Sequence, residues 1–90
     1  MSTLSTDAVP ALANGFRFQW EPAQNSHVLL YPEGMKVLSE SASEITTLCD
    51  GKRSIDDIIA ALLKKFPDAD LRQDVIDFFQ SAVDEGWMNV

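Results

Sequence analysis

A chain of 90 residues holds one small domain, and a composition of 46% hydrophobic and 23% charged residues is that of an ordinary globular protein. The formal net charge of −7 argues against nucleic acid and anionic membranes as partners, because both attract clusters of lysine and arginine. No apolar run approaches the roughly 20 residues of a membrane helix. The single Cys49 cannot form an internal disulfide, so the sequence indicates a cytoplasmic protein.

The opening segment, residues 1–15, is rich in small residues and carries Pro10 and Gly15. It lacks the basic start and the continuous apolar run of a secretory signal. We therefore expect a flexible N-terminal tail over residues 1–15, followed by a single domain over residues 16–90.

Three short segments with strand patterns follow this tail. In FRFQW, residues 16–20, aromatic residues alternate with polar ones, which is typical of a strand with one buried face. HVLLY, residues 27–31, is apolar on both faces, as a central strand is, and a Pro-Glu-Gly turn leads from it into GMKVLS, residues 34–39. The short links predict an antiparallel sheet with the second strand in the middle and the first and third at its edges.

After the third strand the apolar residues follow a helical period, which predicts three helices. At the expected start of each helix stand two residues with the spacing of a capping box: Ser41 and Glu44, Ser54 and Asp57, and Asp70 and Gln73. The second helix has the strongest pattern, because its apolar residues recur every three or four positions from Ile55 to Phe66. The chain closes with WMNV, in which we expect Trp87 and Met88 to complete the core.

Three antiparallel strands followed by three helices form an α+β outline of the winged helix-turn-helix type. Such domains usually read DNA with their last helix. Here that helix carries one basic residue against four acidic ones: Arg72 against Asp74, Asp77, Asp84 and Glu85. An acidic helix repels phosphate, so a winged-helix DNA-binding module remains only as an alternative.

The chain offers one His, one Cys and scattered carboxylates, which form neither a nucleophile with its base nor a cluster of metal ligands. We therefore expect no enzyme activity, no metal and no cofactor, and we interpret His27 and Cys49 as structural. A small acyl-carrier-like protein is a second alternative, because carriers attach their arm to a serine that opens a helix, as Ser54 does. Arg53 stands where a carrier has aspartate, so we favour a helix cap.

The stretches RFQWEPAQ and LLYPEGM, together with LCDG and the closing GW, resemble the PqqD family of peptide chaperones in pyrroloquinoline quinone (PQQ) biosynthesis. The likeness covers about residues 15–90. One departure is Ser39, which stands where the family pattern has asparagine, and either side chain can cap or turn the chain locally.

This resemblance implies a non-catalytic bacterial domain that recognises the precursor of a ribosomally synthesised peptide product. Such a domain binds the leader of the PqqA precursor peptide and presents it to the radical S-adenosylmethionine (SAM) enzyme PqqE. The iron–sulfur clusters and the radical chemistry belong to that enzyme.

We expect the peptide to bind as an added strand at the third strand, because an edge strand has unpaired main-chain groups and this one carries only Lys36 as a charge. The expected peptide-binding residues are Met35, Lys36, Val37, Leu38 and Ser39 of the strand and Arg72, Ile76, Phe79 and Val83 of the third helix. The helix's other apolar row, Leu71, Val75, Phe78 and Ala82, would then face the core, although the pattern also allows the reverse assignment. An exposed edge leaves a homodimer open as well.

Overall fold

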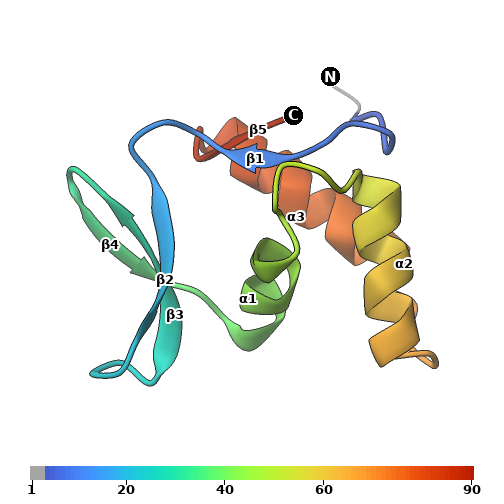
Figure 1. The fold of residues 1–90 in the computed structure, drawn as a ribbon, viewed down its shortest axis with the longest axis horizontal. Helices are drawn as coiled ribbons and strands as arrows, with labels where there is room; N and C mark the ends of the chain where they lie inside the picture. The colour runs from blue at the N-terminus through green and yellow to red at the C-terminus, as the bar shows by residue number, and fades with distance from the viewer. Residues whose placement is uncertain (1–3) are drawn as a thin grey trace.

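The computed structural model describes residues 4–90. Strands β2 (Arg17–Glu21), β3 (Ser26–Tyr31) and β4 (Gly34–Val37) form an antiparallel sheet in the order β2-β3-β4. Helices α1 (Glu40–Thr47), α2 (Ile55–Lys65) and α3 (Arg72–Asp84) follow, and α1 lies between the sheet and α2 (Figure 1). The expected α+β outline is confirmed, with the second strand in the centre of the sheet. None of the helices in the described part of the chain is long and apolar enough to cross a bilayer.

One face of the sheet is turned to the core. Leu29 of β3 pairs with Phe18 of β2 and is buried, and Phe18 packs against the same core. Trp20, which the alternation placed on this buried face, is 50% exposed. It lies at the far end of β2, where its ring contacts that of His27 at a centroid distance of 5.1 Å and borders an open hollow beside α1.

The core is built mainly by the helices. Its buried members are Leu29, Leu38, Ile45, Ile55, Ile58, Ile59, Leu62, Val75, Phe79, Ala82, Trp87 and Met88. The apolar stripe of α2 is buried from Ile55 to Leu62 and ends in the exposed Leu63 and Phe66. Trp87 and Met88 complete the core as expected, because the chain turns back after α3.

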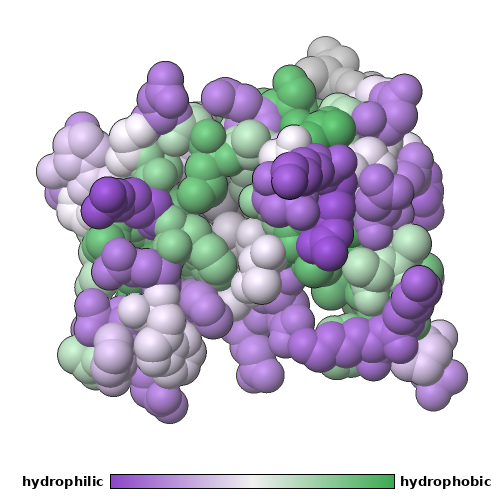
Figure 2. All heavy atoms as spheres, viewed as in Figure 1, coloured by the Kyte–Doolittle hydropathy of each residue, from purple (hydrophilic) through white to green (hydrophobic). Residues whose placement is uncertain are grey.

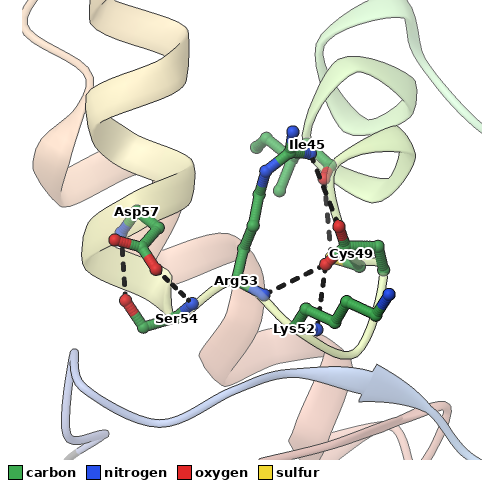
Figure 3. A network of polar contacts seen from close by, with 7 residues as sticks. Ile45, Cys49, Lys52, Arg53, Ser54 and Asp57 are labelled. Carbon is green, nitrogen blue, oxygen red and sulfur yellow. Dashed lines mark hydrogen bonds and ion pairs between the residues drawn. The ribbon is translucent and has the colours of Figure 1, made fainter.

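The loop between α1 and α2 is held by short-range polar contacts (Figure 3). The amide of Asp57 donates to Ser54 Oγ, and the amide of Ser54 donates to Asp57 Oδ2, both at 3.1 Å, so the capping box of α2 is confirmed. Asp50 Oδ1 accepts hydrogen bonds from the amides of Lys52 and Arg53 at 2.9 and 3.0 Å. These bonds hold the pKa of Asp50 below its usual value.

The capping residues expected for the other two helices are wrong. Helix α1 begins after Ser39, whose Oγ accepts a hydrogen bond from the amide of Ala42 at 3.2 Å, so the cap lies two residues before Ser41. Helix α3 begins after Leu71 and has no side-chain cap, so Asp70 does not cap it. Ser41 has the spacing of a capping box with Glu44, but Ser39 is the serine that stands where the chain leaves the sheet and turns into the helix, and it caps.

Residues before β2 lie against the helical half of the molecule. Strand β1 (Ala11–Leu12) pairs antiparallel with β5 (Met88–Asn89), and it passes in front of α3 in Figure 1. Pro10 is buried, and the carbonyl of Ala8 accepts a hydrogen bond from the amide of Ile55 at 3.0 Å. The expectation of a loose tail is therefore wrong for residues 4–12, whereas residues 1–3 of that expected tail lie outside the described residues.

Candidate functional site

Strand β4 lies at an edge of the sheet, with β3 as its only neighbour among the described strands. The amide of Leu38 donates to the carbonyl of His27 at 3.0 Å, which continues the ladder past the end of β4. Hydrogen-bonded and non-bonded pairs alternate in an antiparallel sheet, so Lys36 also bonds to β3 while the N–H and C=O groups of Met35 and Val37 point outward. These outward groups can receive an added strand.

A groove of about 220 Å³ lies between this strand and α3. Its lining residues are Lys36, Val37, Leu38, Ser39 and Ala42 from the strand and the start of α1, and Phe78, Ser81, Ala82, Glu85 and Trp87 from α3 and the residues after it. The strand and the helix that we expected to form one site thus border one cavity.

The strand side of the groove agrees with the expected residues from Lys36 to Ser39, and Met35 is exposed next to them. The helix side does not agree. Phe79 is 0% exposed, and neither it nor Ile76 nor Val83 is among the residues that line the groove. The assignment of the two apolar rows is wrong for these residues, because Phe79 is buried in the core cluster with residues of α2, whereas its neighbour Phe78 lines the groove.

Arg72 also lies away from the groove. Its Nη1 atom forms an ion pair with Asp56 Oδ1 of α2 at 3.2 Å, at the opposite end of α3. Among the other lining residues, Phe78 and Ala82 belong to the row that we expected in the core, and the sequence did not predict Ala42, Ser81, Glu85 and Trp87. Ser81 and Glu85 stand three and seven residues after Phe78, which places all three on one face of a helix. This spacing could have indicated that they line the same groove.

One ion pair joins the two walls of the groove. Lys36 Nζ lies 3.0 Å from Glu85 Oε1, and Ser81 Oγ donates to Glu85 Oε2 at 2.9 Å. The bond from Lys36, and then that from Ser81, hold the pKa of Glu85 below its usual value, so this carboxylate is ionised at neutral pH. Both side chains of the pair are about half exposed, at 46% and 50%, and such pairs add little to stability.

The floor of the groove is aromatic. The ring of Phe78 lies edge-on to the Trp87 ring at a centroid distance of 5.7 Å. Trp87 is only 5% exposed, and its Nε1 atom has no hydrogen-bond partner among the described residues. A buried indole N–H usually finds an acceptor, but none of the oxygens in residues 4–90 accepts a hydrogen bond from this one.

A larger pocket of about 440 Å³ lies between the three helices. Ile45, Leu62, Phe66 and Leu71 supply much of its apolar wall, and Figure 2 shows the surface hollowed between α1 and the end of α2. It contains no strand edge, so it offers an extended chain no ladder of main-chain partners. The groove beside β4 is therefore the better candidate for a peptide site.

The remaining candidate residues have structural surroundings. The ring of His27 stacks on that of Phe18 at 4.8 Å, and Ser54 is engaged in the α2 capping box. Burial, and then the charge of Asp50, raise the pKa of the Cys49 thiol to about 12, which keeps it protonated at neutral pH. Over residues 4–90, no three His, Cys, Asp or Glu side chains gather closely enough to hold a metal ion.

Comparison with known proteins gives matches over most or all of the chain. Residues 26–88 match the family model PqqD, described as coenzyme PQQ synthesis protein D. The chain is 50% identical to the PqqA binding protein of Azotobacter vinelandii, over 100% of this chain and 99% of that protein. It is 48% identical to the PqqA binding protein of Klebsiella pneumoniae, over 90% of this chain and 89% of that protein.

A solved structure has the same fold. It is the solution NMR structure of the PqqD truncation of Methylobacterium extorquens PqqCD, described as a functional and stand-alone recognition element for ribosomally synthesised and post-translationally modified peptides. The TM-score is 0.79 at 26% identity, and the match covers 98% of this chain and 96% of that one.

Proposed function

Because the chain belongs to the PqqD family, we propose that it is a non-catalytic peptide chaperone that binds the leader of the PqqA precursor in the groove between β4 and α3. The relatives named PqqA binding protein and the related recognition element support a peptide as the ligand. We choose this groove because the N–H and C=O groups of Met35 and Val37 point away from β3, and because a cavity bordered by α3 lies beside them.

Strand addition supplies enough free energy for this role. The outward groups of Met35 and Val37 form three or four main-chain hydrogen bonds with an extended peptide, each contributing about 0.5–1.5 kcal/mol. Two or three apolar peptide side chains that cover Val37 and Phe78 add about 1.5–3 kcal/mol each. These gains must exceed the cost of ordering the peptide and the entropy of association, which leaves a dissociation constant in the low micromolar range or tighter.

An NMR titration of the isotope-labelled protein with a synthetic PqqA peptide tests the ligand and the groove together. We expect amide shifts from Met35 to Ser39 and on the face of α3 that carries Phe78 and Ser81, with the exposed end of α2 unchanged. A peptide of the same composition in scrambled order is the control. Shifts with duplex DNA in place of the peptide favour the winged-helix reader and contradict the proposal.

A proline substitution tests strand addition itself. Val37→Pro removes an N–H that points away from β3, so the sheet keeps its own ladder while an added strand loses one partner. The matched control is Trp20→Pro, which removes an outward N–H from the opposite edge, on β2. We expect Val37→Pro to weaken PqqA binding at least tenfold and Trp20→Pro to leave it within about twofold, as measured by calorimetry. Equal effects of the two substitutions contradict binding at β4.

We also propose that the protein presents the bound peptide to the radical SAM enzyme PqqE, as the family resemblance implies. The resemblance also implies that PqqE cross-links a glutamate and a tyrosine of PqqA. The test compares the yield of this cross-link in the presence of the wild-type chain and of Val37→Pro. Wild type is expected to support the reaction and the variant to lose that support in proportion to its loss of peptide affinity. An unchanged yield without the chain contradicts the presenting role.

The open edge of β4 also allows two copies of the chain to pair. Light scattering after size-exclusion chromatography, with and without PqqA peptide, measures the oligomeric state. If dimers use β4, peptide converts them to monomers, because both ligands require the outward groups of Met35 and Val37.

A further inference from the structure

The ion pair between Lys36 and Glu85 spans the space that a peptide on β4 must enter. Both residues line the groove, one on the strand and one just after α3, and their charged atoms lie 3.0 Å apart. The pair is half exposed, so opening it costs little. Ser81 Oγ, which donates to the second carboxylate oxygen, belongs to the helix wall and keeps a partner for Glu85 when Lys36 leaves.

Trp87 supplies a second, independent observation at the same groove. Its Nε1 atom is buried and has no partner among the described residues, although the residue lines the groove. A buried donor without an acceptor has lost its hydrogen bonds to water without replacement, and a ligand oxygen that accepts from it removes this penalty. The Phe78 ring, edge-on to the indole at 80°, is the only aromatic acceptor recorded beside it in the described structure, and N–H contacts to a ring are weak.

We propose that the groove selects peptides that carry a carboxylate, which replaces Glu85 beside Lys36, and that a peptide oxygen then accepts a hydrogen bond from Trp87 Nε1. This inference rests on the proposed peptide-binding function and names the chemistry that the site prefers. The exchange keeps one carboxylate on Lys36 throughout, and the displaced Glu85 carboxylate, which is half exposed, keeps the hydrogen bond from Ser81 and its contact with water. Glu85 acts in the free protein as an internal competitor for the peptide.

Removing the competitor tests the exchange. Glu85→Gln is expected to tighten binding of synthetic PqqA peptide about two- to fivefold, because Lys36 no longer has a bound carboxylate to release. The matched control is Asp84→Asn, which makes the same change of net charge one residue earlier and outside the groove lining. Lys36→Met is expected to weaken binding and to abolish the gain from Glu85→Gln in the double variant.

A second peptide identifies the ligand group. In it every Asp and Glu of the PqqA peptide is replaced by Asn or Gln. The wild-type protein is expected to bind it more weakly, and Glu85→Gln to give no gain with it. The carboxylate proposal is overturned if Glu85→Gln and Asp84→Asn have equal effects, or if the gain is the same for both peptides.

NMR of the indole N–H proton measures the hydrogen bond from Trp87. A substitution of this residue is unsuitable, because removing the buried side chain would disturb the core. Trp20→Phe leaves Trp87 as the only tryptophan, and Trp20 is outside the groove lining. At saturation with PqqA peptide we expect a downfield shift of the indole proton and slower exchange with water. An unmoved indole signal while the amides of β4 shift overturns the inference and leaves the proposed function standing. If the amides of β4 do not shift either, the proposed function fails and the inference with it.

Discussion

Phe78 and Phe79 are neighbours in the chain, with ring centroids 5.3 Å apart and ring planes at 77°, yet they belong to different surroundings. Phe79 is completely buried in the core, whereas Phe78 lines the groove beside β4. The boundary between the core and the candidate site therefore passes between two adjacent aromatic residues of α3.

Replacing Phe78 and Phe79 by alanine, one at a time, distinguishes an effect on peptide binding from an effect on folding stability. Phe79→Ala removes a fully buried ring and is expected to lower the free energy of unfolding by about 3–5 kcal/mol, which unfolds much of a small domain. Phe78→Ala is expected to cost less stability, because the ring is only partly buried, and to weaken binding of PqqA peptide in a folded protein. Urea denaturation and a peptide titration measure the two effects. A Phe78→Ala protein that binds with wild-type affinity contradicts the groove.

The three serines at helix starts are expected to differ in their contribution to stability. Ser54→Ala and Ser39→Ala each remove a cap and should lower the free energy of unfolding by about 0.5–2 kcal/mol. Ser41→Ala is the control, since this exposed serine makes only a hydroxyl contact with Ser39 Oγ at 3.3 Å and caps no helix, so it should change stability by less than about 0.5 kcal/mol. Chemical denaturation measures all three variants, and equal losses for Ser39→Ala and Ser41→Ala would show that α1 begins elsewhere.

Cys49 should make the protein less stable at alkaline pH. Burial raises the pKa of its thiol from 9.0 to about 12, so between these values the unfolded chain loses the proton while the folded chain keeps it. The stabilisation is complete below about pH 9 and is lost as pH rises toward 12. We expect Cys49→Ala to show a shallower loss of stability over this range than wild type, measured by urea denaturation at each pH. Parallel curves for the two proteins would contradict the raised pKa.

The segment before β2 should contribute to the stability of the helical half. Leu12 pairs with Met88 across β1 and β5 and packs against the core, so Leu12→Ala is expected to cost about 1–2 kcal/mol. Val9→Ala on the same segment is the control, because Val9 is exposed and should change stability by less than about 0.5 kcal/mol. Thermal unfolding distinguishes the two, and a neutral Leu12→Ala would mean that this segment does not support the fold.

Local patterns were sufficient wherever neighbouring residues determine the structure. The capping box of Ser54 and Asp57 and the apolar stripe of α2 predicted that helix correctly, because both signals arise within one or two turns. The Pro-Glu-Gly turn and the apolar central strand predicted the sheet and its order for a similar reason. Local spacing gave the wrong cap for α1, because it selected Ser41 instead of Ser39. It also missed strand β1, because a strand of two residues is too short to show a period.

The sequence by itself determined the order of the strands and helices, the edge position of β4 and the family, because these depend on periodicity, turns and motifs along the chain. Only the tertiary structure decided which face of α3 borders the groove, and that Lys36 meets Glu85 over a sequence separation of 49 residues. Both apolar rows of α3 are suited to burial, so the choice between them depends on what packs there. Phe79 is buried among core residues from other elements, and that contact between distant segments leaves Phe78 to line the groove.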